Sequence, residues 1–125
     1  MVHQQSRHQL KINKSAFMCD AKILSQKGTS VISRCAECQC IFIWHHNLIL
    51  SFTPSQFIQF KNFTVDLEFG DHSFPFPDGQ ERVVMRTPVN DIQLTFSVDE
   101  WEDFHAAMDE AAYMHEIYML VDGDR

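Results

Sequence analysis

Three of the chain's four cysteines fall within six residues, in Cys35-Ala36-Glu37-Cys38-Gln39-Cys40, and Cys19 is the fourth. Cysteines separated by two residues can direct both sulfurs at one metal ion, as in a zinc knuckle, and a structural zinc site takes four ligands. The residue types therefore suit zinc, provided that the fold brings Cys19 beside the other three.

A β-hairpin in front of the cluster would bring Cys19 there. Residues 21–34, AKILSQKGTSVISR, read as two strands on either side of Lys27-Gly28, which favours a tight turn. In such a hairpin Cys35 lies across from residues 19–21. We therefore predict structural zinc as the cofactor, with Cys19, Cys35, Cys38 and Cys40 as its four ligands. His45 and His46 are candidates to replace Cys40.

Two other interpretations of the cysteines stay open. Free cysteines often behave as small buried hydrophobic residues, and Cys38 and Cys40, two apart at the start of a predicted strand, would then share a face of that strand. A thiol-based redox or metal-handling role for Cys35 and Cys38 is the other alternative. Low thiol pKa values of the thioredoxin type arise at helix N-termini, whereas a strand follows Cys38 here, which disfavours that mechanism.

No other group of residues forms a catalytic motif. The sequence lacks a phosphate-binding loop, a metalloprotease motif and a hydrolase order of serine, histidine and acid. His45 and His46 fall in a predicted turn, where one of them is expected to face solvent. His105 and His115 are ten residues apart on one predicted helix, too far to share an ion. We therefore expect a non-enzymatic protein.

An internal repeat defines the elements that position these residues. Residues 47–60, NLILSFTPSQFIQF, match residues 91–104, DIQLTFSVDEWEDF, at an offset of 91 − 47 = 44 residues. Each copy begins with the alternating apolar residues of a strand. Each then starts a helix with a capping box, at residues 53–56 and 97–100. Two copies of one strand–helix pattern therefore organise most of the chain.

The repeat, together with the strands expected before each copy, predicts an α+β fold. It consists of an N-terminal β-hairpin followed by two tandem β-hairpin–helix repeats, with an antiparallel sheet and two helices. The predicted ranges are 1–17 for a flexible N-terminal tail, 18–125 for a single domain, and, within it, about 37–69 and 81–120 for the two units.

The two helices are expected to differ in length. The first ends near Phe63, and the second runs from Val98 to about Met119 with an apolar stripe toward the core. Trp101 matches Phe57 in the repeat, so we expect it to be a core residue. In the linker between the units, residues 70–80, two phenylalanines at positions 74 and 76 are expected to hold the loop.

These features resemble a bacterial family of short, uncharacterised proteins. The resemblance rests on Met18-Cys19 near the start, on Cys35 to Cys38, and on the segments NLILSFTPSQF and VNDIQLTFSVDEW, and it covers about residues 18–120. It implies one domain that begins near Met18 and contains a cysteine knuckle and two strand–strand–helix units. It implies no activity and supplies no catalytic residues.

The composition limits the classes of partner. Hydrophobic residues make up 45% of the chain, with 11 phenylalanines, but no apolar run suits a membrane span or a secretory signal. The net charge is −7, with nine of the 17 acidic residues in 99–125, and such a surface repels nucleic acid. We therefore expect a cytoplasmic binding or regulatory module, without nucleic-acid or membrane binding, whose partner is an unknown protein or a second copy of the chain.

Overall fold

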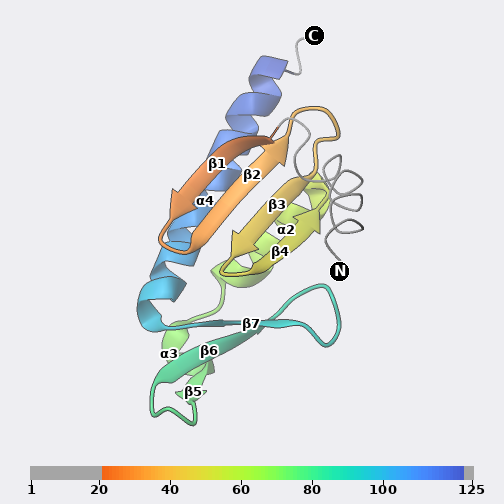
Figure 1. Cartoon of the computed structure of the whole chain (residues 1–125). Helices are drawn as coiled ribbons and strands as arrows, with labels where there is room; N and C mark the ends of the chain where they lie inside the picture. Colours follow the sequence, from red (N-terminus) through yellow and green to blue (C-terminus); the bar gives the residue numbers. More distant parts are fainter. Residues whose placement is uncertain (1–20, 123–125) are drawn as a thin grey trace, which may run out of the picture.

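A computed structural model describes residues 21–122 of the chain, as two antiparallel sheets with helices packed behind the larger one (Figure 1). The elements in chain order are β1 (Ala21–Lys27), β2 (Ser30–Cys35), β3 (Ile41–His45), β4 (Leu48–Phe52), α2 (Pro54–Val65), α3 (Phe69–His72), β5 (Ser73–Pro75), β6 (Glu81–Arg86), β7 (Gln93–Phe96) and α4 (Val98–Asp122).

The larger sheet is a meander of four strands in the order β1-β2-β3-β4. The predicted N-terminal hairpin forms its first half, and Ala21 pairs with Cys35 as the proposed register requires. Gly28 takes a left-handed conformation, with φ 55°, in the turn. A side chain there would also collide with the carboxylate of Asp103 on α4, so both backbone and space favour glycine.

The second strand pair forms a sheet of its own. The α+β class and the order of hairpin, first unit and second unit are confirmed, but β6 and β7 join β5 in a three-stranded sheet instead of extending the larger one. The physical reason is the turn at Asp78-Gly79, which folds the linker back so that Ser73 to Pro75 pair with Val83 to Glu81. The linker thus supplies a third strand, and the short helix α3 precedes it.

The two phenylalanines of the linker contact each other, and one of them contacts an arginine. Phe74 and Phe76 stack with ring centroids 5.4 Å apart, and the Arg82 guanidinium lies 5.2 Å from the Phe76 ring centroid. Phe74 is nevertheless 51% exposed. The two rings therefore contact each other in the loop while Phe74 stays half-exposed, and the pairing of β5 with β6 also holds the loop.

Both helix starts have the predicted capping boxes. The Thr53 hydroxyl accepts from the backbone N–H of Gln56, whose side-chain oxygen accepts from the Thr53 N–H. The same reciprocal bonds join Ser97 and Glu100 at the start of α4. Helix α2 extends two residues past Phe63, and α4 extends to Asp122.

The core lies between the larger sheet and the two long helices. Figure 1 shows α4 passing behind β1 and β2, and α2 behind β3 and β4. Trp101 is 5% exposed and the matching Phe57 is fully buried, so the predicted pairing of these positions is confirmed. Each buried aromatic side chain contributes about 1.5–3 kcal/mol by leaving water. By contrast, Met119 at the end of the predicted stripe is 42% exposed, since α4 extends beyond the sheet there.

Candidate functional site

The cysteine segment is a closed loop between β2 and β3. The Cys35 N–H donates to the Cys40 carbonyl at 2.9 Å, and the Gln39 N–H donates to the Cys35 carbonyl at the same distance. Gln39 has a left-handed φ of 64°. The predicted placement of Cys38 and Cys40 on one face of a strand is therefore wrong. Strand β3 begins only at Ile41, and the left-handed Gln39 breaks the alternation of side chains.

The loop gathers three sulfurs. The Cys38 backbone N–H donates to the Cys35 sulfur at 3.4 Å. Burial raises the pKa of the Cys40 thiol, and a hydrogen bond to Cys38 and the charge of Cys38 raise it further. Cys38 is exposed and Cys40 is half-buried, and both are free thiols, whereas Cys35 is buried and disulfide-bonded. The arrangement is compatible with metal binding once all three sulfurs are thiolates.

The fourth predicted ligand, Cys19, lies outside the described residues, as does the predicted tail. The four-cysteine zinc site therefore stays a prediction. His45 is no replacement for Cys40, because it ends β3 while Cys40 precedes the start of that strand. A strand of this length separates the two by about 16 Å.

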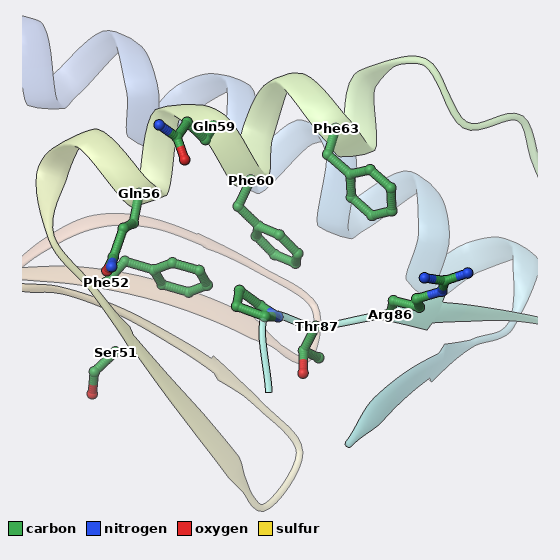
Figure 2. A pocket seen from close by; sticks show the side chains of 9 residues that line it. Ser51, Phe52, Gln56, Gln59, Phe60, Phe63, Arg86 and Thr87 are labelled. Carbon is green, nitrogen blue, oxygen red and sulfur yellow. The ribbon is translucent and has the colours of Figure 1, made fainter. Parts of the chain in front are cut away.

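An apolar groove lies between α2 and the strands on either side of it. Its volume is about 560 Å³. Figure 2 shows Phe52 and Phe60 directed into this space, with Phe63 further along the helix. The Phe60 ring stacks on Phe52 at 5.1 Å and faces Phe63 at 6.2 Å, measured between centroids. The groove therefore has an aromatic wall, to which one face of α2 contributes Phe60 and Phe63.

Polar side chains line the groove beside this aromatic wall. Arg86 at the end of β6, followed by Thr87 and Pro88, lines the side opposite α2 (Figure 2). Arg86 is exposed and forms no ion pair among residues 21–122. Gln56 and Gln59 bring two amides from the helix. The groove can thus hold an apolar group and an anionic group together.

Sequence analysis did not predict this groove, because its walls come from both repeat units. Phe60 belongs to the first unit and Arg86 to the second, so no linear motif contains both. One signal was present: Phe57, Phe60 and Phe63 recur every three residues, which is too many aromatics for one buried helix face. Accordingly Phe57 is buried and Phe63 is 47% exposed.

The histidines divide into buried and exposed members. Of the adjacent pair, His45 is buried and His46 is exposed, as expected for one of the two. Burial lowers the pKa of His45, and the neighbouring His46 lowers it further. On α4, burial likewise lowers the pKa of His105 and of His115, the latter with a contribution from the Arg34 charge.

Comparison with known families assigns the chain to one of them. Residues 18–122 match the model of a family described as a family of unknown function, DUF6686. The chain belongs to this family. No curated protein and no solved structure matches it. The family description names no activity, so the geometry of residues 21–122 carries the functional argument. Within those residues, no helix combines the length and the apolar character that crossing a bilayer requires.

Proposed function

We propose that this DUF6686 protein is a non-enzymatic binding module whose groove holds a peptide segment of a partner protein, apolar in its side chains and carrying a carboxylate. The observation that carries the proposal is the meeting, in one groove, of the aromatic wall (Phe52, Phe60 and Phe63) with the guanidinium of Arg86, which has no ion-pair partner among residues 21–122.

The aromatic wall supports an apolar ligand. Phe63 is 47% exposed although its neighbour Phe60 is buried, so part of the wall remains in contact with water. Covering such a ring removes apolar area from water at about 25 cal/mol per Å². The groove volume of about 560 Å³ suits one or two apolar side chains and not a whole helix.

Arg86 supports the carboxylate. A guanidinium presents a planar fork of N–H groups that matches a carboxylate with two parallel hydrogen bonds. The chain as a whole carries a net charge of −7, so an arginine without an ion pair in the described residues is a local exception. The Gln56 amide oxygen is used by the Thr53 N–H, which leaves its NH₂ group for a peptide carbonyl.

The residues around the groove support a role without catalysis. Its lining contains no histidine, cysteine or acidic residue, so it has no general base or strong nucleophile. The structure does contain a serine–histidine contact, from Ser30 Oγ to His45 Nδ1 at 3.4 Å. Ser30 is fully buried, however, and no substrate could reach its hydroxyl.

A structural zinc held by Cys35, Cys38 and Cys40, with Cys19 as the fourth ligand, remains part of the proposal. The approach of Cys38 and Cys40 to Cys35 within one loop supports it, because a reduced Cys35 would lie beside two further thiols. Binding requires reduction of the Cys35 disulfide, which an added thiol reductant supplies. The zinc-bound form therefore requires a reducing environment such as the cytoplasm, where thiols stay reduced.

The second candidate function is thiol–disulfide exchange. It rests on one observation: the exposed free thiol of Cys38 lies in the same short loop as the disulfide-bonded Cys35. A thiolate at Cys38 would attack that disulfide, form a new bond to one sulfur and release the other as a thiolate. Measurement of the Cys38 thiol pKa by the pH dependence of alkylation tests it, and a value near the ordinary 8.5 would exclude an activated thiol.

Chemical-shift mapping tests the binding proposal. A short peptide that ends in Leu-Phe with a free carboxylate is titrated into the labelled protein, and backbone amide shifts are followed. Perturbations centred on residues 56–63 and 86–88 are expected. Shifts confined to another surface would overturn the proposal. Shifts in the same region that depend on protein concentration without peptide would overturn it in favour of a second copy of the chain as occupant.

A further inference from the structure

Two histidines and a glutamate meet at the junction between the two repeat units. One ligand atom from each of His45, His46 and Glu100 lies within 4.8 Å of the other two. His45 ends β3, His46 begins the turn to β4, and Glu100 lies in the first turn of α4. These residues are distant from the cysteine loop and from the groove lining.

The turn brings the two imidazoles together. Side chains of successive strand residues point to opposite faces, so adjacent histidines normally diverge. His46 instead has a left-handed φ of 56°, which is uncommon for a residue other than glycine. The two ring centroids lie only 4.4 Å apart as a result. Uncommon backbone conformations of this kind concentrate where a side chain has to be aimed.

The capping box at the start of α4 orients the third group, the Glu100 carboxylate. Glu100 Oε1 accepts from the Ser97 N–H at 2.9 Å, and this fixes the carboxylate at the helix start. Glu100 Oε2 points the other way and accepts from His46 Nε2 at 2.8 Å. The Glu100 side chain is only 27% exposed. One oxygen therefore serves the cap while the other faces the histidines.

Further contacts hold the buried histidine. His45 is 4% exposed, and its ring lies against Phe96 with centroids 4.7 Å apart. Its Nδ1 lies 3.4 Å from Ser30 Oγ, and its Nε2 lies 3.4 Å from the Thr95 carbonyl oxygen. Whichever nitrogen binds a metal, the other keeps an oxygen partner that orients the ring, as metal-bound histidines generally require.

A hollow of about 340 Å³ adjoins the histidines, between the start of β4 and β7. His45 and His46 form part of its lining, together with Gln93 and Thr95. This hollow leaves room for a water molecule or a small ligand atom beside the two histidines.

We propose that His45, His46 and Glu100 bind one divalent transition-metal ion, with Zn²⁺ as the best match, and that a water from the hollow completes the coordination. Two imidazoles and one carboxylate form a ligand set typical of zinc, whereas Mg²⁺ and Ca²⁺ prefer oxygen ligands throughout. Ligands at about 2.1 Å from a tetrahedral ion are about 3.4 Å apart. His46 Nε2 and Glu100 Oε2, now 2.8 Å apart, have to separate by roughly half an ångström to admit the ion, and the exposed His46 allows this adjustment.

The repeat shows which substitution removes the carboxylate of this site and keeps the helix cap. Gln56 occupies the position of Glu100 in the first unit and makes the same capping bonds with Thr53. Glu100→Gln therefore keeps an amide oxygen for the Ser97 N–H but removes the carboxylate. Glu102→Gln is the control, because it removes an exposed carboxylate two residues further along α4.

Zinc titration by calorimetry on the full chain tests the proposal. Cysteines are first blocked by N-ethylmaleimide, so that thiolates do not contribute. We expect about one Zn²⁺ per chain, no comparable binding of Mg²⁺, and a loss of affinity of about tenfold or more in Glu100→Gln and in His46→Asn. Asparagine is chosen because it tolerates the left-handed conformation. Glu102→Gln should bind like the unmodified sequence.

Thermal melts and cobalt spectra distinguish zinc binding at this site from misfolding of a variant and from metal binding at the cysteine loop. Thermal melts without metal first show whether each variant remains folded, and Zn²⁺ should then raise the melting temperature of the parent protein but not of Glu100→Gln. Absence of Zn²⁺ binding after cysteine blocking, or equal affinity in the parent and both site variants, would overturn the proposal. A cobalt spectrum with a thiolate-to-metal band that disappears on blocking would assign metal to the cysteine loop alone.

Discussion

The two repeat units begin in the same way and end differently. Both place a strand before a capping box, and both bury an aromatic residue, Phe57 or Trp101, one position after that box. The first unit joins the front hairpin in the four-stranded sheet and has a helix of 12 residues, whereas the second forms part of a separate sheet and has a helix of 25 residues.

This difference shows that a shared local pattern fixes helix starts but not sheet membership. Helix α2 packs against β4, and its aromatic face forms the groove together with Arg86 of the second unit. Helix α4 packs behind β1 and β2, and its first turn places Glu100 beside the turn of the first unit. The groove and the proposed metal site therefore both lie where the units meet.

The largest expected effect is the loss of an aromatic core residue. Trp101→Ala should lower the free energy of unfolding by about 3–5 kcal/mol, and Phe57→Ala by a similar amount, because both side chains are buried. Chemical denaturation measures both. A cost below about 1 kcal/mol at one position only would show that the two units do not share their core role.

Loss of a cap should cost less and should be equal in the two units. Thr53→Ala and Ser97→Ala each remove a hydroxyl that accepts from a backbone N–H of the first helical turn. We expect each variant to lose about 1 kcal/mol of unfolding free energy. A clearly larger loss for Ser97→Ala in metal-free protein would indicate that Glu100 has a further structural role at the junction.

Acid should destabilise the protein gradually through its buried histidines. The folded-state pKa values of His105 and His115 are lowered, first by burial. The unfolded chain, with histidine pKa values of about 6.5, therefore binds more protons than the folded protein just below that pH. By linkage the stability is complete above about pH 6.5 and falls as the pH decreases below it.

Denaturation at a series of pH values measures this slope. His115→Gln should reduce the loss of unfolding free energy between about pH 6.5 and 5, since one proton-binding group is removed from the unfolded state. Carboxylates with lowered pKa values, such as Asp78, act only at still lower pH. An unchanged slope in His115→Gln would show that this histidine is protonated in the folded state.

The smallest effect on stability is expected in the groove. Phe63→Ser should change the unfolding free energy by no more than about 0.5 kcal/mol, because the ring is largely exposed. The same variant should nevertheless weaken binding of the Leu-Phe peptide. Retained peptide affinity in a folded Phe63→Ser protein would mean that the aromatic wall is not the binding surface.

Local chemistry explains which features were predictable. The Lys27-Gly28 turn, both capping boxes and the burial of Trp101 depend on neighbouring residues, and sequence analysis predicted each of them. Sheet membership was not predictable, because it depends on the pairing of β5 with β6 after an additional short helix. The cysteine loop departed from a strand because Gln39 adopts a left-handed conformation that no sequence motif announced.

The same distinction applies to the candidate sites. The knuckle spacing of Cys35 and Cys38 is local, and it correctly indicated that the sulfurs gather. The contact of His46 with Glu100 spans 54 residues and follows from how α4 packs against the first unit. Arg86 meets Phe60 for the same reason. Sites between units need the tertiary arrangement, even where each half lies in a recognisable repeat.

The central claim is that Arg86 makes the groove selective for a carboxylate. The direct measurement compares the affinity of the Leu-Phe peptide with a free carboxylate and as its amide, for the parent protein and for Arg86→Gln. Arg82→Gln is the control, since Arg82 lies on the same strand but pairs with Asp78. We predict a preference of about tenfold for the carboxylate in the parent and in Arg82→Gln, and none in Arg86→Gln. Equal affinities in the parent, or a preference that survives in Arg86→Gln, would contradict the account.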